Sequence, residues 1–217
     1  DLHRVDRRQR QMCIRDSRKS GEHEIGWDCN KRTLDGFCPD LGWIRASLTP
    51  IFAIHAAYDA KRRRINRLAS KKLHTGKRLK QKYSKREQNR IKQAIHQLTN
   101  AIASIGSRHG FEDIEKSGMY HKNKRRSKRK RWNRELGYTD WKKIINFTAY
   151  KSVVDLFDPY HTSKDCSRCG YENKDLKGEK FECGRCRLII DRQLNAAVNV
   201  YLKMEGLPHD IGWFDNN

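Results

Sequence analysis

The chain has 217 residues, of which 48 are Lys or Arg and 26 are Asp or Glu, so its formal net charge at pH 7 is +22. This length suits one large domain, or one domain with a small insertion. The clustered positive charge predicts a polyanionic partner, nucleic acid rather than a membrane surface; a merely solubilising charge is the alternative. No apolar run reaches the roughly 18 residues of a membrane span and no secretory signal is visible, so we expect neither a membrane protein nor an exported one.

Seven cysteines occur in a chain without an export signal. We therefore expect reduced thiols or metal ligands rather than disulfides, and a cytoplasmic location. The stretch MCIRDS (Met12–Ser17) is the translation of a common sequencing adapter. Residues 1–17 are accordingly expected to be non-native, Cys13 to have no role, and the chain to be a fragment of a protein that begins upstream.

Three strands are predicted before residue 50. EHEIGWDCN is a strand candidate that ends at Asp28, TLDGF predicts a turn and the start of a second strand, and Leu41–Leu48 predicts a third.

Residues 51–105 predict an antiparallel helical hairpin. Apolar residues recur at helical spacing from Ile51 to about Lys72, Gly76 is expected to break the first helix, and the second helix is expected to end near Ser104. Any single charge on the outer faces is best explained as solvated, but together they predict a surface for nucleic-acid phosphates. The candidates are Lys61, Arg62, Arg63 and Arg64.

A second basic stretch runs from Lys122 to Arg134. So dense a run repels itself, and we expect it to be disordered unless an anionic partner binds it. Trp132 within it either stacks on a base or caps the following helix. The nucleic-acid-binding candidates are Lys124, Arg125, Arg126, Lys128, Arg129, Lys130 and Arg131.

The remaining pattern alternates strands and helices. A short strand is predicted at His109–Glu112, a helix at Tyr138–Tyr150, and a strand in SVVDLFDP that ends by Pro159. Together with a last helix this predicts an α/β domain with a small module inserted late.

Two C-x-x-C pairs form that module. Cys166 and Cys169 are separated by 13 residues from Cys183 and Cys186. Four thiolates in tetrahedral array bind Zn²⁺ with no open position, so the spacing predicts a structural zinc site. A redox pair is the weaker alternative.

Three acids stand at the ends of predicted elements. Asp28 and Glu112 end strands, and Asp191 precedes the last helix. Taken singly, each has an ordinary explanation as a turn residue, a solvated acid or a helix cap. Taken together in a basic chain, they could converge on Mg²⁺ and support phosphodiester hydrolysis.

The chain resembles the TnpB family, transposon-encoded relatives of type V CRISPR nucleases. The resemblance rests on GWDCN, FEDIEKSGM, DPYHTSKDCSRCG and DRQLNAAVN, in that order along the chain. It implies an RNA-guided, Mg²⁺-dependent DNA endonuclease with a RuvC-like domain of the RNase H type and an inserted zinc ribbon. Guide RNA and DNA would be the partners, Asp28 and Glu112 would match the first two acidic motifs, and the four cysteines would hold zinc. The implied domains are 18–160 for the RuvC-like part, 161–189 for the ribbon, 190–205 for the last RuvC-like helix and 206–217 for a tail.

The third acidic motif departs from the family pattern D-x-N-A-A. Gln193 stands where the catalytic Asp belongs, and Asp191 lies two residues earlier. Either Asp191 replaces it as the third Mg²⁺ ligand, which we favour because Asp28 and Glu112 are retained, or the protein is a nuclease-dead nucleic-acid binder. The family's N-terminal region, which reads the motif beside the target and grips the guide, is also missing.

Overall fold

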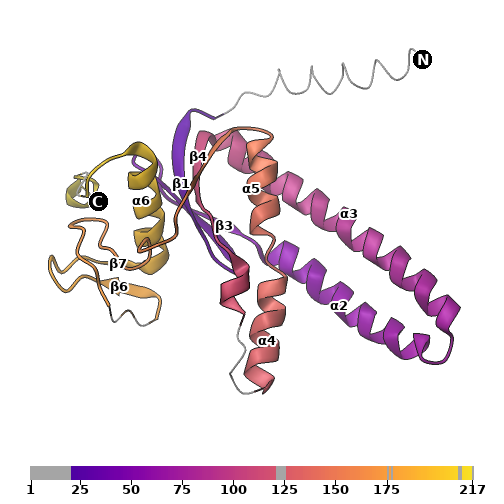
Figure 1. Ribbon diagram of the computed structural model, residues 1–217. Helices are drawn as coiled ribbons and strands as arrows, with labels where there is room; N and C mark the ends of the chain where they lie inside the picture. The colour runs from indigo at the N-terminus through magenta and orange to yellow at the C-terminus, as the bar shows by residue number, and fades with distance from the viewer. Residues whose placement is uncertain (1–20, 121–125, 175, 177, 210–211, 217) are drawn as a thin grey trace, which may run out of the picture.

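The computed structural model describes residues 21–216, apart from 121–125, 175, 177, 210 and 211. A five-stranded mixed sheet in the order β3-β2-β1-β4-β5 lies at its centre (Figure 1). β1 to β3 pair antiparallel, and β4 and β5 join parallel to β1, so the predicted α/β class is confirmed. The strands are β1 His23–Cys29, β2 Thr33–Cys38, β3 Gly42–Ser47, β4 Gly106–Glu112 and β5 Val153–Phe157.

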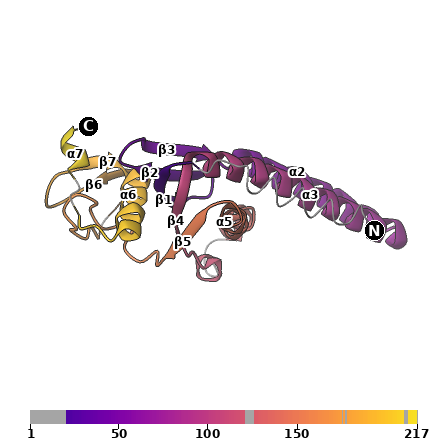
Figure 2. The ribbon, with the colours of Figure 1, turned by 90° about the horizontal axis from the view of Figure 1, so that it is seen from above.

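The predicted hairpin is formed by α2 (Thr49–Ala69) and α3 (Leu73–Ile105), which extend from one end of the sheet (Figures 1 and 2). The expectation that Gly76 breaks the first helix is wrong. The chain reverses before Leu73, and Gly76 lies buried inside α3, where a Cβ atom would come within 2.4 Å of the Ala69 Cβ. The glycine allows the two helices to approach closely, and this packing outweighs its low helix propensity.

The second basic stretch is helical where the structure describes it. After a 3-10 turn (η1, Lys116–Met119), α4 spans Arg126–Gly137, so the expected disorder is wrong from Arg126 onward. Leu136 of α4 is fully buried, which anchors the helix despite its charge. Lys124 and Arg125 lie outside the described residues. The next helix, α5 (Trp141–Ala149), begins three residues later than expected.

Two helical layers cover the sheet. On one face, Ile25 and Trp27 of β1 pack with Ile95 of α3 and Ile144 of α5 in the main core. On the other face lies α6 (Arg192–Glu205), whose Ala197 and Val198 pack against β2 (Figure 2). β6 (Lys180–Glu182), β7 (Ile189–Asp191) and a short α7 (Trp213–Asn216) lie at that end of the molecule.

Two glycines bring α6 close to the sheet. Gly26 of β1 and Gly110 of β4 are direct neighbours in the parallel ladder. A Cβ at Gly26 would lie 2.3 Å from the backbone nitrogen of Tyr201, and one at Gly110 would lie 3.1 Å from the Met204 Sδ. The next residues that point to the same face are Asp28 and Glu112, because side chains alternate along a strand.

No helix in the described part of the chain has the length and the apolar character that crossing a bilayer requires.

Candidate functional site

Asp28 and Glu112 lie side by side at the carboxyl ends of two adjacent parallel strands. The ladder pairs Trp27 with Phe111, and both strands continue by one residue to reach the acids. Both residues are buried, with 6% and 4% of their surface exposed. The structure therefore brings these two of the three predicted acids together.

Polar neighbours hold each carboxylate in place. Asn30 Nδ2 donates a hydrogen bond to Asp28 Oδ2 at 2.6 Å. The Thr162 hydroxyl and the Cys29 backbone N–H both donate to Glu112. The two carboxyl groups are close enough for each to affect the ionisation of the other.

Burial raises the pKa of both acids. The pKa of Asp28 is raised well above its usual range by burial first and then by the negative charge of Glu112. The pKa of Glu112 is also raised by burial, although the hydrogen bond from Thr162 and the charge of Lys203 act in the opposite direction. Two buried carboxylates that cannot both ionise cheaply are suited to a hard divalent cation, which prefers oxygen ligands.

A third buried acid, Asp35, extends the row across the sheet. It lies directly opposite Asp28 in the β1–β2 ladder, and Asn30 Nδ2 links the two by a second bond of 3.2 Å. Its charge is balanced, because Arg45 Nε donates to it at 2.6 Å and Thr33 at 2.7 Å. Sequence reasoning missed Asp35 and Arg45; the available signal was a hairpin register that places residues 28, 35 and 45 in line.

Asp191 and Gln193 lie at the start of α6, and both contact Arg45. Asp191 caps the helix, with Oδ1 accepting the Gln193 backbone N–H at 2.8 Å. Its other oxygen is 3.8 Å from Arg45 Nη2, and the same guanidinium donates to the Gln193 side-chain oxygen. Arg45 therefore stands beside both candidates for the third metal ligand.

The structure thus brings two of the three predicted catalytic acids together. Within the described residues, the four cysteines are the one group of three or more His, Cys, Asp or Glu side chains with ligand atoms within 4.8 Å of one another. Asp28, Glu112 and Asp191 do not form a second such group.

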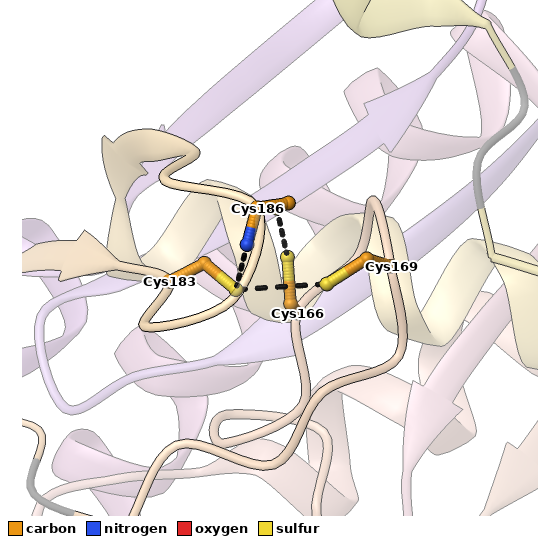
Figure 3. Close-up of side chains that lie close together, drawn as sticks. All are labelled: Cys166, Cys169, Cys183 and Cys186. Atoms are coloured by element: carbon orange, nitrogen blue, oxygen red, sulfur yellow. Dashed lines mark hydrogen bonds between the residues drawn. The ribbon is translucent and has the colours of Figure 1, made fainter.

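The cysteines converge as their spacing predicts (Figure 3). Cys166 and Cys186 have sulfurs 3.5 Å apart, and Cys169 and Cys183 have sulfurs 3.6 Å apart. With Zn–S bonds of about 2.3 Å, a tetrahedral site requires sulfurs about 3.8 Å apart, so the cluster fits Zn²⁺ closely.

Backbone donors favour a thiolate in this cluster. The N–H groups of Arg185 and Cys186 each lie 3.4 Å from the Cys183 sulfur. Although burial acts to raise the pKa of Cys183, these donors lower it to about 6. Phe181 is fully buried beside the cysteines and completes a small core for the module.

The N-A-A-x-N motif attaches this module to α6. Asn195 accepts a hydrogen bond from the Ser167 backbone at 3.0 Å and donates to the Asp165 carbonyl at 2.8 Å. Asn199 donates to the carbonyls of Thr162 and Asp165 at 2.8 and 2.7 Å. Because Thr162 also holds Glu112, the cysteine module and the carboxylate pair share one support.

Comparison with known proteins agrees with this architecture. The family described as Cas12f1-like, TNB domain matches residues 141–200. The TnpB-like protein MJ1635 of Methanocaldococcus jannaschii is 31% identical over 86% of this chain and 44% of its own length. The TnpB-like protein MJ0012 of the same organism is 36% identical over 55% of each chain.

The chain belongs to the TnpB family. It spans about half the length of the TnpB-like relatives MJ1635 and MJ0012. A solved structure, "Cryo-EM structure of the Cas12f1-sgRNA-target DNA complex", has the same fold over 84% of this chain and 49% of its own, with a TM-score of 0.52 and 20% identity.

Three of the four basic candidates on the hairpin contact other side chains of this chain. Lys61 lies over the rings of Tyr58 and Tyr83. Arg62 pairs with Glu87, and Arg63 Nη1 lies 2.8 Å from Asp59. Arg64 is exposed on the surface of α2.

The basic residues of α4 are largely exposed. Lys128, Lys130 and Arg131 face solvent, Arg129 is half-buried, and Arg131 pairs with Glu135 at 3.1 Å. The backbone of Arg126 begins the helix.

Trp132 of α4 has a packing role in this structure. Its indole nitrogen donates to the Met119 carbonyl at 3.1 Å, and Lys31 lies 3.9 Å from the ring centroid. The residue at the N-cap of α5 is Asp140, so Trp132 does not cap that helix, and stacking on a base stays a prediction.

Proposed function

We propose that the chain is the catalytic part of a transposon-associated, RNA-guided DNA endonuclease that depends on Mg²⁺. The sheet would be an RNase H-like domain of the RuvC type, with 161–189 as an inserted zinc ribbon. Family membership supports the reaction class, and the basic surfaces of α2 and α4 support a guide RNA and a DNA strand as partners.

The buried pair Asp28–Glu112 is the observation that carries the proposal. The two acids come from strands far apart in the sequence, meet at one end of the sheet, and have raised pKa values because of burial. An isolated buried pair of this kind costs stability, so its placement is better explained by chemistry than by packing.

The residues of the site divide the work. Asp28 and Glu112 would present carboxylate oxygens to Mg²⁺, while Asn30 and Thr162 fix their orientation. The bound cation would supply charge for the attacked phosphate and an activated water. Lys203 of α6 is close enough to affect Glu112 electrostatically, so it favours the ionised form that binds a cation.

Asp191 is the proposed third ligand. It lies at the end of β7 with extended backbone, and its Oδ2 atom is 3.8 Å from Arg45 Nη2. Sharing a cation with Asp28 and Glu112 would require Asp191 and Arg45 to change position, because the three acids do not form one ligand group in this structure.

A second function, a nuclease-dead binder of nucleic acid, is favoured by one observation. Gln193 occupies the family's acid position, and its side-chain oxygen is held by Arg45. The neutral Gln193 amide, bonded to the Arg45 guanidinium, lacks the negative charge that a third carboxylate ligand of Mg²⁺ supplies.

Mn²⁺ binding tests the metal site without requiring a substrate. Electron paramagnetic resonance of Mn²⁺ titrated into the zinc-loaded chain should reveal a site that Asp28→Asn and Glu112→Gln each weaken at least about tenfold. Asp155→Asn is the matched control, since this β5 acid pairs with Arg108 at 2.6 Å. Equal Mn²⁺ affinity in the parent and the three variants would contradict the proposed metal site.

DNA cleavage separates the two functions. The RNA that co-purifies with the chain is sequenced, and a complementary DNA is incubated with the complex and Mg²⁺. Cleavage that disappears with Asp28→Asn and with Asp191→Ala supports the proposed nuclease. No cleavage by the parent protein, with cleavage gained in Gln193→Asp, would establish the binder instead.

A further inference from the structure

A pocket of about 280 Å³ lies between α2 and α3, away from the carboxylate row. This volume is slightly below the range of about 300–1,000 Å³ typical of pockets for drug-sized ligands, so it suits one small planar group. The lining residues from α2 are Tyr58, Arg62, Ile65 and Asn66, and those from α3 are Lys80, Tyr83, Ser84 and Glu87.

The contact between α2 and α3 differs along the hairpin. Near the turn they touch at Ala69 and Gly76, where even a Cβ atom on Gly76 would lie 2.4 Å from the Ala69 Cβ. Further along, the two helices are separated by the rings of Tyr58 and Tyr83, whose centroids are 6.5 Å apart at an angle of 59°. Rings at this angle do not stack on each other, and of the two only Tyr83 is half-buried, because Tyr58 is 3% exposed.

Positive charge surrounds the aromatic rings. Lys61 lies 4.8 Å from the centroid of Tyr58 and 5.3 Å from that of Tyr83, and Arg90 lies 6.0 Å from Tyr58. Lys80 adds a further charge at the pocket wall.

The one acid that lines the pocket is already paired. Glu87 is 7% exposed, accepts a hydrogen bond from Arg62, and contacts His55 Nδ1 at 3.1 Å. The lining is therefore aromatic and cationic, a combination that recognises a planar ring attached to an anion.

We propose that this pocket binds one unstacked nucleotide of a single-stranded nucleic acid. The base packs against the half-buried ring of Tyr83, with Tyr58 buried behind it, and the phosphate lies toward Lys80 and Arg62. The inference rests on the nucleic-acid part of the proposed function but not on cleavage, because the pocket shares no residue with the carboxylate site. Stacking of a base on an aromatic side chain is sequence-tolerant, so the site is expected to accept more than one base.

Fluorescence anisotropy with labelled 12-nucleotide strands tests this proposal in zinc-containing, Mg²⁺-free buffer. The probes are an oligo-U ribonucleotide, an oligo-dT deoxyribonucleotide and an abasic deoxyribonucleotide of equal length and charge. Tyr83→Ala should weaken binding of the base-containing strands by about 5- to 150-fold, the range that corresponds to about 1–3 kcal/mol of stacking per base. It should leave the abasic strand unchanged.

Two further variants keep the result independent of folding. Tyr83→Phe retains the ring and should bind as the parent does. Ser84→Trp fills the pocket while both tyrosines remain, and should reproduce the loss seen with Tyr83→Ala. Tyr150→Ala is the control, because Tyr150 is an exposed tyrosine (53%) at the end of α5.

The outcomes are distinct. Loss confined to the ribonucleotide supports a site for the guide, loss confined to the deoxyribonucleotide supports a site for a DNA strand, and loss with both supports a nucleotide site indifferent to the 2′-hydroxyl. Equal weakening of base-containing and abasic strands, or no weakening by Ser84→Trp, overturns the proposal. If binding depends on the base but the chain cleaves no DNA, the nucleotide site is supported and the proposed nuclease activity is rejected.

Discussion

Replacing Asp28 by Asn should stabilise the folded chain in the absence of divalent cations. The carboxylate is buried, lies against Glu112, and has a raised pKa because of burial and that neighbouring charge. The amide of the variant is the same size, still accepts from Asn30, and can donate to Glu112. The substitution therefore removes the repulsion between the carboxylates of residues 28 and 112 and retains the side-chain packing.

The size of the effect follows from the pair. Two unit charges about 4 Å apart repel by about 4 kcal/mol at an effective dielectric constant of about 20. The charge-assisted bond from Asn30 becomes a neutral one, which takes back about 1 kcal/mol, and partial protonation of the parent reduces the gain further. We therefore expect about 1–3 kcal/mol of added stability at pH 8, or a melting temperature raised by roughly 2–12 °C for a chain of this size.

Thermal unfolding at pH 8 measures this shift, in zinc-containing buffer without chelator so that the cysteine cluster stays loaded. Asp35→Asn is the matched control, because Asp35 is also buried but is bonded by Arg45, Thr33 and Trp43. Breaking a buried pair by removing one partner is destabilising, so the control should melt lower. Saturating Mg²⁺ should raise the melting temperature of the parent and leave that of Asp28→Asn unchanged.

The same pair sets a pH dependence. Folded Asp28 and Glu112 hold protons that the unfolded chain releases above about pH 4, so their contribution to stability falls as pH rises from there. The stability difference between Asp28→Asn and the parent should therefore grow from pH 5 to pH 8. A variant that melts below the parent at pH 8, or a difference that shrinks with rising pH, would refute the reasoning.

Three further predictions concern other parts of the molecule. Cys183→Ser should release zinc, detected with a colorimetric chelator, and should unfold the module locally so that trypsin cleaves after Lys164 and Arg185, which are already on its surface. Cys38→Ser, outside the cluster, should keep the zinc and resist this cleavage. Gly26→Ala should lower the free energy of unfolding by about 1–3 kcal/mol, because it forces α6 away from β1. Gly137→Ala, where a Cβ meets nothing within 4 Å, should melt within about 2 °C of the parent. Equal melting temperatures for the two variants would contradict the close packing at Gly26. Arg64→Ala should reduce the slope of log affinity against log salt for single-strand binding by about 0.7. Arg63→Ala should reduce this slope less, because the guanidinium of Arg63 pairs with Asp59. A larger effect of Arg63→Ala would show that the ion pair opens on binding.

Local patterns predicted the parts of the fold that local chemistry determines. Alternating residues gave the strands around Asp28, the repeat of isoleucines gave the helical hairpin, and two C-x-x-C pairs gave the cysteine cluster. The expectation that Asp28, Glu112 and Asp191 could converge rested on their positions at element ends, and it is the parallel pairing of β1 with β4 that brings the first two together.

Features set by contacts far apart in the sequence could not be predicted. Arg45 reaches Gln193 across 148 residues, and no local pattern indicates that a β3 cation will stand beside the start of α6. Gly76 was misjudged because propensity favours a break, whereas contact with Ala69 favours a glycine inside the helix. Helix α4 was misjudged because its charge was visible, but the burial of Leu136 was not.

The alternation along β1 makes the chain unequally tolerant of length changes. Deleting one residue before Asp28 would rotate that acid into the apolar layer and turn Ile25 or Trp27 toward α6, so a single deletion would disrupt both the proposed metal site and the core. Extra residues at the reversal between Ala69 and Leu73 would merely lengthen an exposed turn, at a small entropic cost. Natural insertions and deletions in relatives, and engineered fusions, are expected to accumulate at that reversal and to be absent from β1.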